Sequence, residues 1–333
     1  MTVAVTGASG HVGANLVRAL LARGESVRCL VRKDRRALAG LDVELVEGEV
    51  NDREALGRAF VGADVVFHLA AKISIQGSLG GLVERTNIEG ARNVAEVALA
   101  QGVRRLVHCS SIHAFDQRRS GAPVDERTAR ALAVSFPAYD RSKAHGERAV
   151  REVIARGLDA VIVHPTAVLG PFDFKPSRMG QVLLDLYRRR FVALVPGGFD
   201  WVDVRDVVAG MLAAAAQGRR GESYLLSGHY LTVGALAAAA ESVTGVAAPR
   251  QVVPSWLARF GAPFVLGYNR LRGDEPLYTS ESLRALGGNP SISSHKARAE
   301  LGYDSRPLVE TIRDTYAWLE EAGALTAASG AGS

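Results

Sequence analysis

A glycine-rich turn near the N-terminus constrains this chain more than any other feature. The apolar segment TVAVT at residues 2–6 reads as a β-strand, and TGASGHVG at residues 6–13 follows it directly. Gly7, Gly10 and Gly13 permit a tight turn and let a pyrophosphate approach the backbone closely. The helix that opens there offers free N–H groups and the positive end of its dipole. A turn without a ligand is the alternative, but its place between a strand and a helix favours a dinucleotide site.

Strand-like and helix-like segments alternate over the first 165 residues. Six short apolar segments are expected to form strands: 2–6, 26–31, 43–46, 64–69, 104–109 and 159–164. Several are continuously apolar, as in parallel sheets whose two faces are covered by helices. Apolar side chains recur at helical spacing in residues 12–23 and 84–101, and a glycine follows each segment. The alternation predicts an α/β fold of the Rossmann type, with a doubly wound parallel sheet.

The pattern changes after Pro165. Helical spacing appears in four later segments: 178–190, 232–245, 254–272 and 307–320. Residues 199–216 read as a short strand that turns into a helix, and residues 222–227 read as another strand. We expect the following organisation: residues 1–170 as a dinucleotide-binding domain to which 199–230 return, 171–198 and 231–325 as a smaller, mostly helical substrate lobe, and 326–333 as a disordered tail.

Composition argues against several classes of protein. The net charge is +5, but the arginines that dominate the basic residues are scattered, so a nucleic-acid partner is not expected. Two cysteines, Cys29 and Cys109, do not make a disulfide framework and suit a reducing compartment. No apolar run approaches the ~20 residues that span a bilayer, and the strand-like start leaves no room for a signal peptide. A cytoplasmic protein without a membrane, nucleic-acid or metal partner is expected.

The end of the second expected strand distinguishes NAD from NADP. An acidic residue there would accept hydrogen bonds from the 2′-hydroxyl of the ribose. This chain instead has Arg32 and Lys33, which can pair with a 2′-phosphate, and arginine does so with two parallel hydrogen bonds. Asp34 is the one contrary residue, and it comes later than expected. A solvated basic loop is the alternative, but with the glycines upstream we predict NADP.

Tyr139 and Lys143 are the catalytic candidates. Residues four places apart share one face of a helix, so the Lys143 ammonium can lie near the Tyr139 hydroxyl and the cofactor ribose. A neighbouring cation lowers the pKa of a tyrosine from about 10 towards working pH, which suits a general acid. An exposed Tyr–Lys pair is the alternative.

Ser110 and Ser111 follow the fifth strand at the ligand edge of the sheet, and we prefer Ser111 because it lies further into the crevice.

Six segments of the chain occur in the order of one known family. They are TGASGHVG (6–13), VFHLAA (66–71), TNIEGARNV (86–94), HCSSIHAF (108–115), YDRSK (139–143) and HPTAVLGPF (164–172). Together they resemble the extended short-chain dehydrogenases/reductases, within the NAD(P)-dependent epimerase/dehydratase superfamily. The branch that looks most similar contains dihydroflavonol 4-reductase and cinnamoyl-CoA reductase. The resemblance spans roughly residues 1–320 and is specific over the first 175.

The resemblance implies a Ser–Tyr–Lys centre, here Ser111, Tyr139 and Lys143, of which the last two also contact the cofactor. The resemblance implies further cofactor contacts in the glycine turn and at the strand ends: Gly7, Ser9, Gly10, His11, Val12, Gly13, Arg32, Val50, Leu69, Ala70, Ala71 and Pro165. The argument from charge given above adds Lys33 to them. Glu49 departs from the family pattern, which often has Asp beside the adenine. Asn87 is expected close to the site, or else as a buried structural amide.

Candidates for substrate contacts lie in the same crevice. Lys72 is expected either to hold an anionic group of the substrate or to be solvated. His113 is expected to orient the substrate or relay a proton, with a surface histidine as the alternative. Phe172, Phe174 and Met179 are expected to line an apolar pocket, with core packing as the alternative for each of them.

The sequence therefore predicts NADPH-dependent reduction of a ketone or aldehyde, with Tyr139 as general acid. A nucleotide-sugar epimerase or dehydratase on the same scaffold is the first alternative. Arg178, Arg188–Arg190 and Arg250 would supply cations for its diphosphate, but the apparent 2′-phosphate site argues against it. An NADP-sensing regulator without catalysis is the second alternative. The resemblance also suggests a homodimer through helices at 84–101 and 139–156.

Overall fold

The computed structural model describes residues 1–118, 121–191, 193–254 and 280–325. Seven strands form a central sheet in the order β3-β2-β1-β4-β5-β6-β9. They are β1 (Thr2–Thr6), β2 (Ser26–Val31), β3 (Glu44–Glu47), β4 (Val65–His68), β5 (Arg105–Cys109), β6 (Ala160–Pro165) and β9 (Ser223–Leu226). All neighbouring pairs are parallel. The strand order reverses between β1 and β4, so the predicted doubly wound fold is confirmed.

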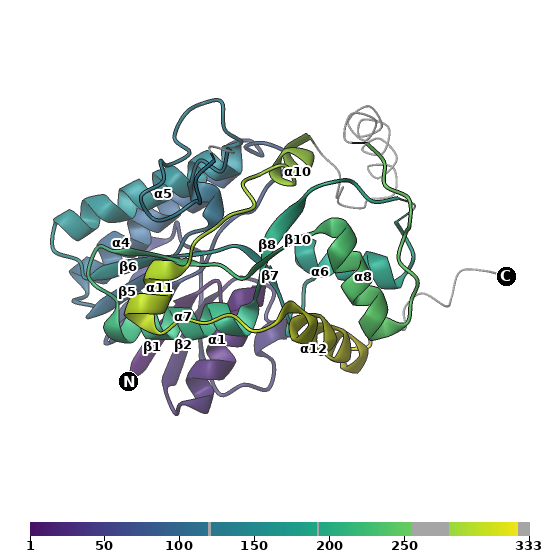
Figure 1. Ribbon diagram of the computed structural model, residues 1–333. Helices are drawn as coiled ribbons and strands as arrows, with labels where there is room; N and C mark the ends of the chain where they lie inside the picture. The colour runs from purple at the N-terminus through teal and green to yellow at the C-terminus, as the bar shows by residue number, and fades with distance from the viewer. Residues whose placement is uncertain (119–120, 192, 255–279, 326–333) are drawn as a thin grey trace.

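Helices cover both faces of this sheet (Figure 1). One face carries α1 (His11–Ala22), α7 (Val204–Gln217) and α11 (His295–Leu301). The opposite face carries α2 (Arg53–Phe60), α4 (Gly90–Ala100) and α5 (Ala138–Ala155). Successive side chains of a strand point to opposite faces, so Val3 and Val5 join one apolar cluster and Ala4 joins the other. Burial on both sides explains why the strands are continuously apolar.

A second sheet of three strands has the order β10-β8-β7. Its strands are β7 (Ala167–Leu169), β8 (Gly198–Asp203) and β10 (His229–Thr232). We expected residues 199–230 to return to the main sheet, and α7 and β9 do so, but β8 and β10 do not. The sheets meet closely at Gly228, where an added Cβ would lie 1.9 Å from the carbonyl oxygen of Trp201. Pairing of β8 with β7 depends on such contacts and not on the apolar pattern of β8 itself.

The smaller lobe contains α6 (Arg178–Tyr187), α8 (Val233–Thr244), α10 (Ser280–Ala285) and α12 (Leu308–Glu321). In Figure 1, α6, α8 and α12 lie together on the side opposite α4 and α5, and they share an apolar core that includes Trp201 of β8. The helix expected at 254–272 lies almost entirely outside the described residues, as does the tail at 326–333. The domain boundaries above stay a prediction.

Two expectations from the sequence concern disulfide bonds and membrane-spanning helices. Cys29 and Cys109 are both free thiols. Among the described residues, no helix combines the length and the apolar character that crossing a membrane requires.

Candidate active site

The three predicted catalytic side chains meet at the carboxyl end of β5. Ser111 lies just beyond this strand, whereas Tyr139 and Lys143 lie on the first two turns of α5. The Ser111 side chain lies near enough to the Tyr139 hydroxyl to lower its pKa. The Lys143 Nζ donates to the carbonyl oxygen of Cys109 at 3.0 Å. All three side chains are buried, so they form a pre-organised group and not an exposed pair on a helix surface.

Burial controls the proton affinities in this group. Burial raises the pKa of Tyr139, and the hydrogen bond from Ser111 offsets this only in part. Burial lowers the pKa of Lys143. The sequence argument expected Lys143 to lower the pKa of Tyr139, and this is wrong for the structure described here, because the ammonium group is directed to the Cys109 carbonyl. Tyr139 therefore keeps its proton at neutral pH, which is the form that a general acid requires.

The two adjacent serines have different environments. The Ser110 Oγ donates to Glu147 Oε1 at 2.8 Å, inside the protein. The Ser111 Oγ accepts a hydrogen bond from the backbone N–H of His113 at 3.2 Å, on the side of Tyr139. Successive residues of an extended backbone point in opposite directions, so only one of the two can face the crevice. That residue is Ser111.

The glycine-rich turn fits a dinucleotide pyrophosphate. Gly10 is the N-cap of α1 and provides no capping side chain, so the first N–H groups of the helix are free for an anion. Gly7 has a φ of +75°, and an added Cβ would lie 2.6 Å from the backbone nitrogen of Ala70. An added Cβ at Gly13 would lie 2.2 Å from the Gly7 carbonyl oxygen. No other residue type keeps this turn so close to both α1 and β4.

The loop after β2 offers two cations. Arg32 and Lys33 are exposed there, and neither forms an ion pair within the described part of the chain. Arg36 instead pairs with Asp34, and its hydrogen bonds lower the pKa of Asp34 to about 2. Asp34, the contrary residue of the sequence argument, is thus neutralised by its neighbour, and Arg32 and Lys33 are left free for an anion.

The other residues predicted to bind the cofactor surround this crevice or support it. Leu69–Ala71 follow β4 opposite the glycine turn, and the Leu69 N–H donates to the Thr6 carbonyl at 3.0 Å. The Ser9 Oγ donates to the Asp34 carbonyl at 2.8 Å. The His11 ring is turned towards the carbonyl oxygens of residues 170 and 171, each at 3.1 Å, so only its backbone faces the site. The remaining members are Val12 within α1, buried Val50 after β3 and buried Pro165 at the end of β6; Glu49 is exposed.

Asn87 has a structural position beside the catalytic helix. It is buried in a π-helical turn, Arg85–Glu89, which separates the short helix α3 (Leu82–Glu84) from α4. The helix expected at 84–101 is interrupted at this point. The Asn87 side chain exchanges hydrogen bonds with the Lys72 backbone at 2.7 and 3.0 Å and donates to Ser142 Oγ at 2.8 Å. Asn87 thus fixes the Lys72 backbone, whereas the partly exposed Lys72 side chain stays a candidate for substrate contact.

The predicted aromatic residues of the substrate pocket pack between α1 and α12. The Phe174 and Trp318 rings meet edge to face at 5.4 Å, and the Phe172 ring lies 6.2 Å from Trp318. The Arg18 guanidinium lies over the Phe172 ring at 4.6 Å. Met179 packs beside the same apolar cluster. These are packing contacts, and a role for Phe172, Phe174 and Met179 in substrate binding stays a prediction.

Sequence reasoning missed a buried ionic cluster behind the catalytic residues. Glu147 lies one helical turn beyond Lys143 and accepts hydrogen bonds from Ser110, His164 and Arg130. Burial alone would raise the pKa of Glu147, but His164 and Arg130 hold it below its usual range. The available signal was a glutamate four residues after Lys143, on the same buried face of α5. Its partners are distant in sequence and carried no signal.

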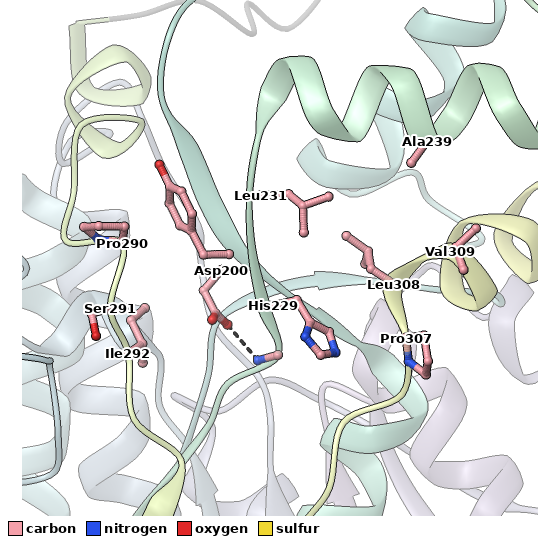
Figure 2. A pocket seen from close by; sticks show the side chains of 12 residues that line it. Asp200, His229, Leu231, Ala239, Pro290, Ser291, Ile292, Pro307, Leu308 and Val309 are labelled. Atoms are coloured by element: carbon pink, nitrogen blue, oxygen red, sulfur yellow. Dashed lines mark hydrogen bonds between the residues drawn. The ribbon is translucent and has the colours of Figure 1, made fainter.

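A separate hollow of about 680 Å³ lies between β10, residues 290–292 and the start of α12 (Figure 2). Leu231, Ile292 and Leu308 supply apolar lining. The buried carboxylate beside it, Asp200, already accepts hydrogen bonds from Thr166 and from the Gly228 N–H, each at 2.7 Å. None of the predicted site residues lines this hollow. Asp200 therefore links the segments that connect the two sheets through its Oδ1.

The doubly wound sheet, with a glycine-rich turn where its strand order reverses between β1 and β4, defines an NAD(P)-dependent oxidoreductase. The model of the NAD dependent epimerase/dehydratase family matches residues 3–227, and the chain belongs to this family. It is 39% identical to sterol demethylase protein B of Methylococcus capsulatus, over 97% of this chain and 99% of that protein.

Two further similarities extend over almost the whole chain. A putative dihydroflavonol 4-reductase of Synechocystis is 33% identical, over 96% of this chain and 94% of that protein. The crystal structure of gox2253 superimposes with a TM-score of 0.84 at 34% identity, over 97% of this chain and 98% of that one. The predicted membership of the extended short-chain dehydrogenases/reductases is confirmed.

Proposed function

We propose that the protein uses NADPH to reduce a ketone or aldehyde to an alcohol. One observation carries the proposal: the buried Tyr139 lies beside Ser111 at the carboxyl end of β5, with Lys143 one turn further along α5. This edge of the sheet is where a doubly wound fold binds its ligands. The free cations Arg32 and Lys33 support NADPH, because a 2′-phosphate would pair with them.

Each residue has a distinct part in this reaction. NADPH, when bound, supplies the hydride that the carbonyl carbon receives. Tyr139 transfers its hydroxyl proton to the carbonyl oxygen, and Ser111 orients that oxygen by a hydrogen bond. Lys143 binds the cofactor ribose and stabilises the negative charge left on Tyr139, because only one of its three N–H groups is used by the Cys109 carbonyl. The free N–H groups at the start of α1 bind the pyrophosphate.

A nucleotide-sugar epimerase or dehydratase receives less support from this chain. Its substrate carries a diphosphate, and most of the arginines that would bind it have partners inside the protein. Arg188 donates to the Ala324 carbonyl at 2.7 Å, and Arg250 pairs with Glu241 at 2.7 Å. Arg190 lies 3.5 Å from Asp185. The name of the relative from Synechocystis, a putative reductase, agrees with the proposal.

NADPH oxidation with a panel of ketones, aldehydes, CoA thioesters and nucleotide sugars tests the proposal. With an accepted carbonyl, Tyr139→Phe should lower kcat by about 10²–10⁴-fold, the usual contribution of a positioned general acid. The NADPH dissociation constant should stay unchanged, because the ring and Lys143 remain. Lys143→Met should weaken both turnover and NADPH binding. Ser111→Ala should cost less than Tyr139→Phe, because the serine orients the carbonyl without transferring the proton.

Three results would contradict this function. Near wild-type turnover by folded Tyr139→Phe would exclude the proposed acid. Tight NADPH binding without turnover of any carbonyl compound would favour a regulator that senses NADP. Turnover of nucleotide sugars without net NADPH consumption would favour the epimerase alternative.

A further inference from the structure

His113 and Asp140 form a pair beside the catalytic residues that the reaction above does not use. His113 lies in a short 3-10 helix, Ile112–Ala114, which starts immediately after Ser111. Asp140 follows Tyr139 on the first turn of α5. Their side chains meet with His113 Nδ1 at 2.9 Å from Asp140 Oδ1. Asp140 directly follows Tyr139 and His113 lies two residues after Ser111, so the pair joins the two segments that carry these catalytic residues.

This pair fixes the orientation of the imidazole. A carboxylate only accepts hydrogen bonds at neutral pH, so the ring nitrogen that faces Asp140, Nδ1, carries a proton. The other ring nitrogen, Nε2, is available to exchange protons. His113 is the hydrogen-bonding partner of Asp140 among the described side chains. The backbone N–H of His113 is held as well, because it donates to Ser111 Oγ at 3.2 Å. Both ends of the residue are thus tied to the catalytic centre.

The imidazole connects the buried Tyr139 with solvent. The rings of His113 and Tyr139 meet edge to face, with their centroids 5.4 Å apart. The His113 side chain is 32% exposed, whereas Tyr139 is 9% exposed. The imidazole is therefore in ring contact with Tyr139 and partly open to solvent. His113 is therefore placed to exchange protons with solvent on one side and with Tyr139 on the other.

Three other polar groups near Tyr139 are buried or already hydrogen-bonded. The Lys143 ammonium is buried against the Cys109 carbonyl, and burial raises the pKa of the Cys109 thiol. The Asn87 amide is occupied by Lys72 and Ser142.

Further charges lie around Asp140. Glu281 of α10 is near enough for its own pKa to be raised by burial and by Asp140, and Arg284 and Arg141 act on it in the opposite direction. Tyr139 is the titratable group in ring contact with His113.

We propose that His113, held by Asp140, returns the proton to Tyr139 after each turnover; this rests on the reductase function proposed above. Tyr139 is left as a tyrosinate when it gives its proton to the substrate oxygen. The Nε2–H bond of the His113 imidazolium then breaks and the Tyr139 O–H bond forms. The neutral imidazole takes a proton from water or a buffer acid. One solvent proton and one NADPH are consumed for each alcohol formed.

Single-turnover and steady-state measurements on His113→Ala separate this role from the others. With enzyme in excess over NADPH, the first reduction should proceed at the wild-type rate, because Tyr139 starts with its proton. Steady-state kcat should fall about 10-fold or more, because reprotonation becomes limiting. Added imidazole should restore kcat with saturation, while KM and the NADPH dissociation constant stay within about twofold of wild type.

Two further variants test the chemistry of the side chain. His113→Gln keeps a polar group of similar size but cannot relay a proton, so it should be as slow as His113→Ala. Asp140→Asn should reduce kcat less, because the imidazole is retained but its cationic form loses a partner. Recovery of kcat in His113→Gln, a slowed first turnover, or no rescue by imidazole would each overturn the relay. A wild-type enzyme that reduces no carbonyl would instead reject the function on which the relay depends.

Discussion

At the level of single residues, the cofactor preference depends on which basic side chains after β2 are not already in an ion pair. Arg35 pairs with Glu47 and Arg36 pairs with Asp34, each at 2.8 Å or less, so their charges are already compensated. Arg32 and Lys33 have no such partner within the described residues. Charge-assisted hydrogen bonds from arginine to phosphate are among the strong ones in proteins. A preference for NADPH over NADH is therefore expected to depend on Arg32 more than on its neighbours.

Arg32→Asp should lower kcat/KM for NADPH by about 10- to 100-fold, because a charged hydrogen bond is lost and a repulsive carboxylate is added. The same variant should keep or improve its efficiency with NADH, because aspartate accepts from a 2′-hydroxyl. Steady-state kinetics with both cofactors measure the effect. Arg35→Ala is the matched control and should change the ratio little. Equal efficiency of the wild type with both cofactors would reject the assignment.

At the level of elements, the loop after β7 is anchored to the cofactor-binding helix. The buried Asn15 of α1 donates to the Pro171 carbonyl at 2.9 Å, next to the two contacts from His11. Phe172 has a φ of +60°, which is uncommon for a bulky residue and needs support from its surroundings. The hydrogen bonds of this loop to α1 connect it to the helix that we propose binds the pyrophosphate.

Asn15→Ala removes a buried donor and should lower the free energy of unfolding by about 1–2 kcal/mol. It should also weaken NADP binding, because the N-terminal half of α1 loses its support. Urea unfolding and NADP titration measure the two effects. Asn93→Ala is a control on the partly exposed surface of α4 and should stay within about 0.5 kcal/mol of wild type. If NADP protects the Asn15→Ala protein against urea unfolding as well as it protects the wild type, the proposed link between this loop and cofactor binding is wrong.

For the whole molecule, the ionic cluster at Glu147 joins three parts of the chain. It connects α5 with β6 through His164, with the loop before α5 through Arg130, and with the end of β5 through Ser110. The pKa of Glu147 in the folded protein lies below its usual range. A depressed carboxyl pKa stabilises the fold above the unfolded pKa of about 4.3, and this contribution is lost as the pH falls.

Glu147→Gln should lower the free energy of unfolding at pH 7 by about 3–5 kcal/mol, because the buried His164 and the partly exposed Arg130 would both lose their carboxylate partner. Its stability should also depend less on pH than that of the wild type below about pH 4.3, because the carboxyl group that takes up the proton is gone. Urea unfolding between pH 7 and pH 3 measures both effects. The exposed Glu310→Gln is the control. Parallel pH profiles for wild type and Glu147→Gln would contradict this role of the cluster.

Local sequence determined the strand–turn–helix at residues 2–22 and the six strands up to Pro165. Apolar periodicity and glycine placement are local signals, and they report directly which backbone conformation and which face are buried. The predicted spacing of Tyr139 and Lys143 follows in the same way from the geometry of one helix. These parts of the fold and of the candidate site were therefore accessible from the residues alone.

Tertiary structure alone decided which polar groups meet. His113 pairs with Asp140 across 27 residues, and Asn15 binds the Pro171 carbonyl across 156. Periodicity indicates that a side chain is buried but does not identify its distant partner, because that depends on how the elements pack. The pKa of Tyr139 follows the same rule: the sequence placed a cation one turn away, but packing buried the hydroxyl and directed Lys143 to Cys109. The sequence thus determined the chemical groups of the site, and packing determined their protonation and their partners.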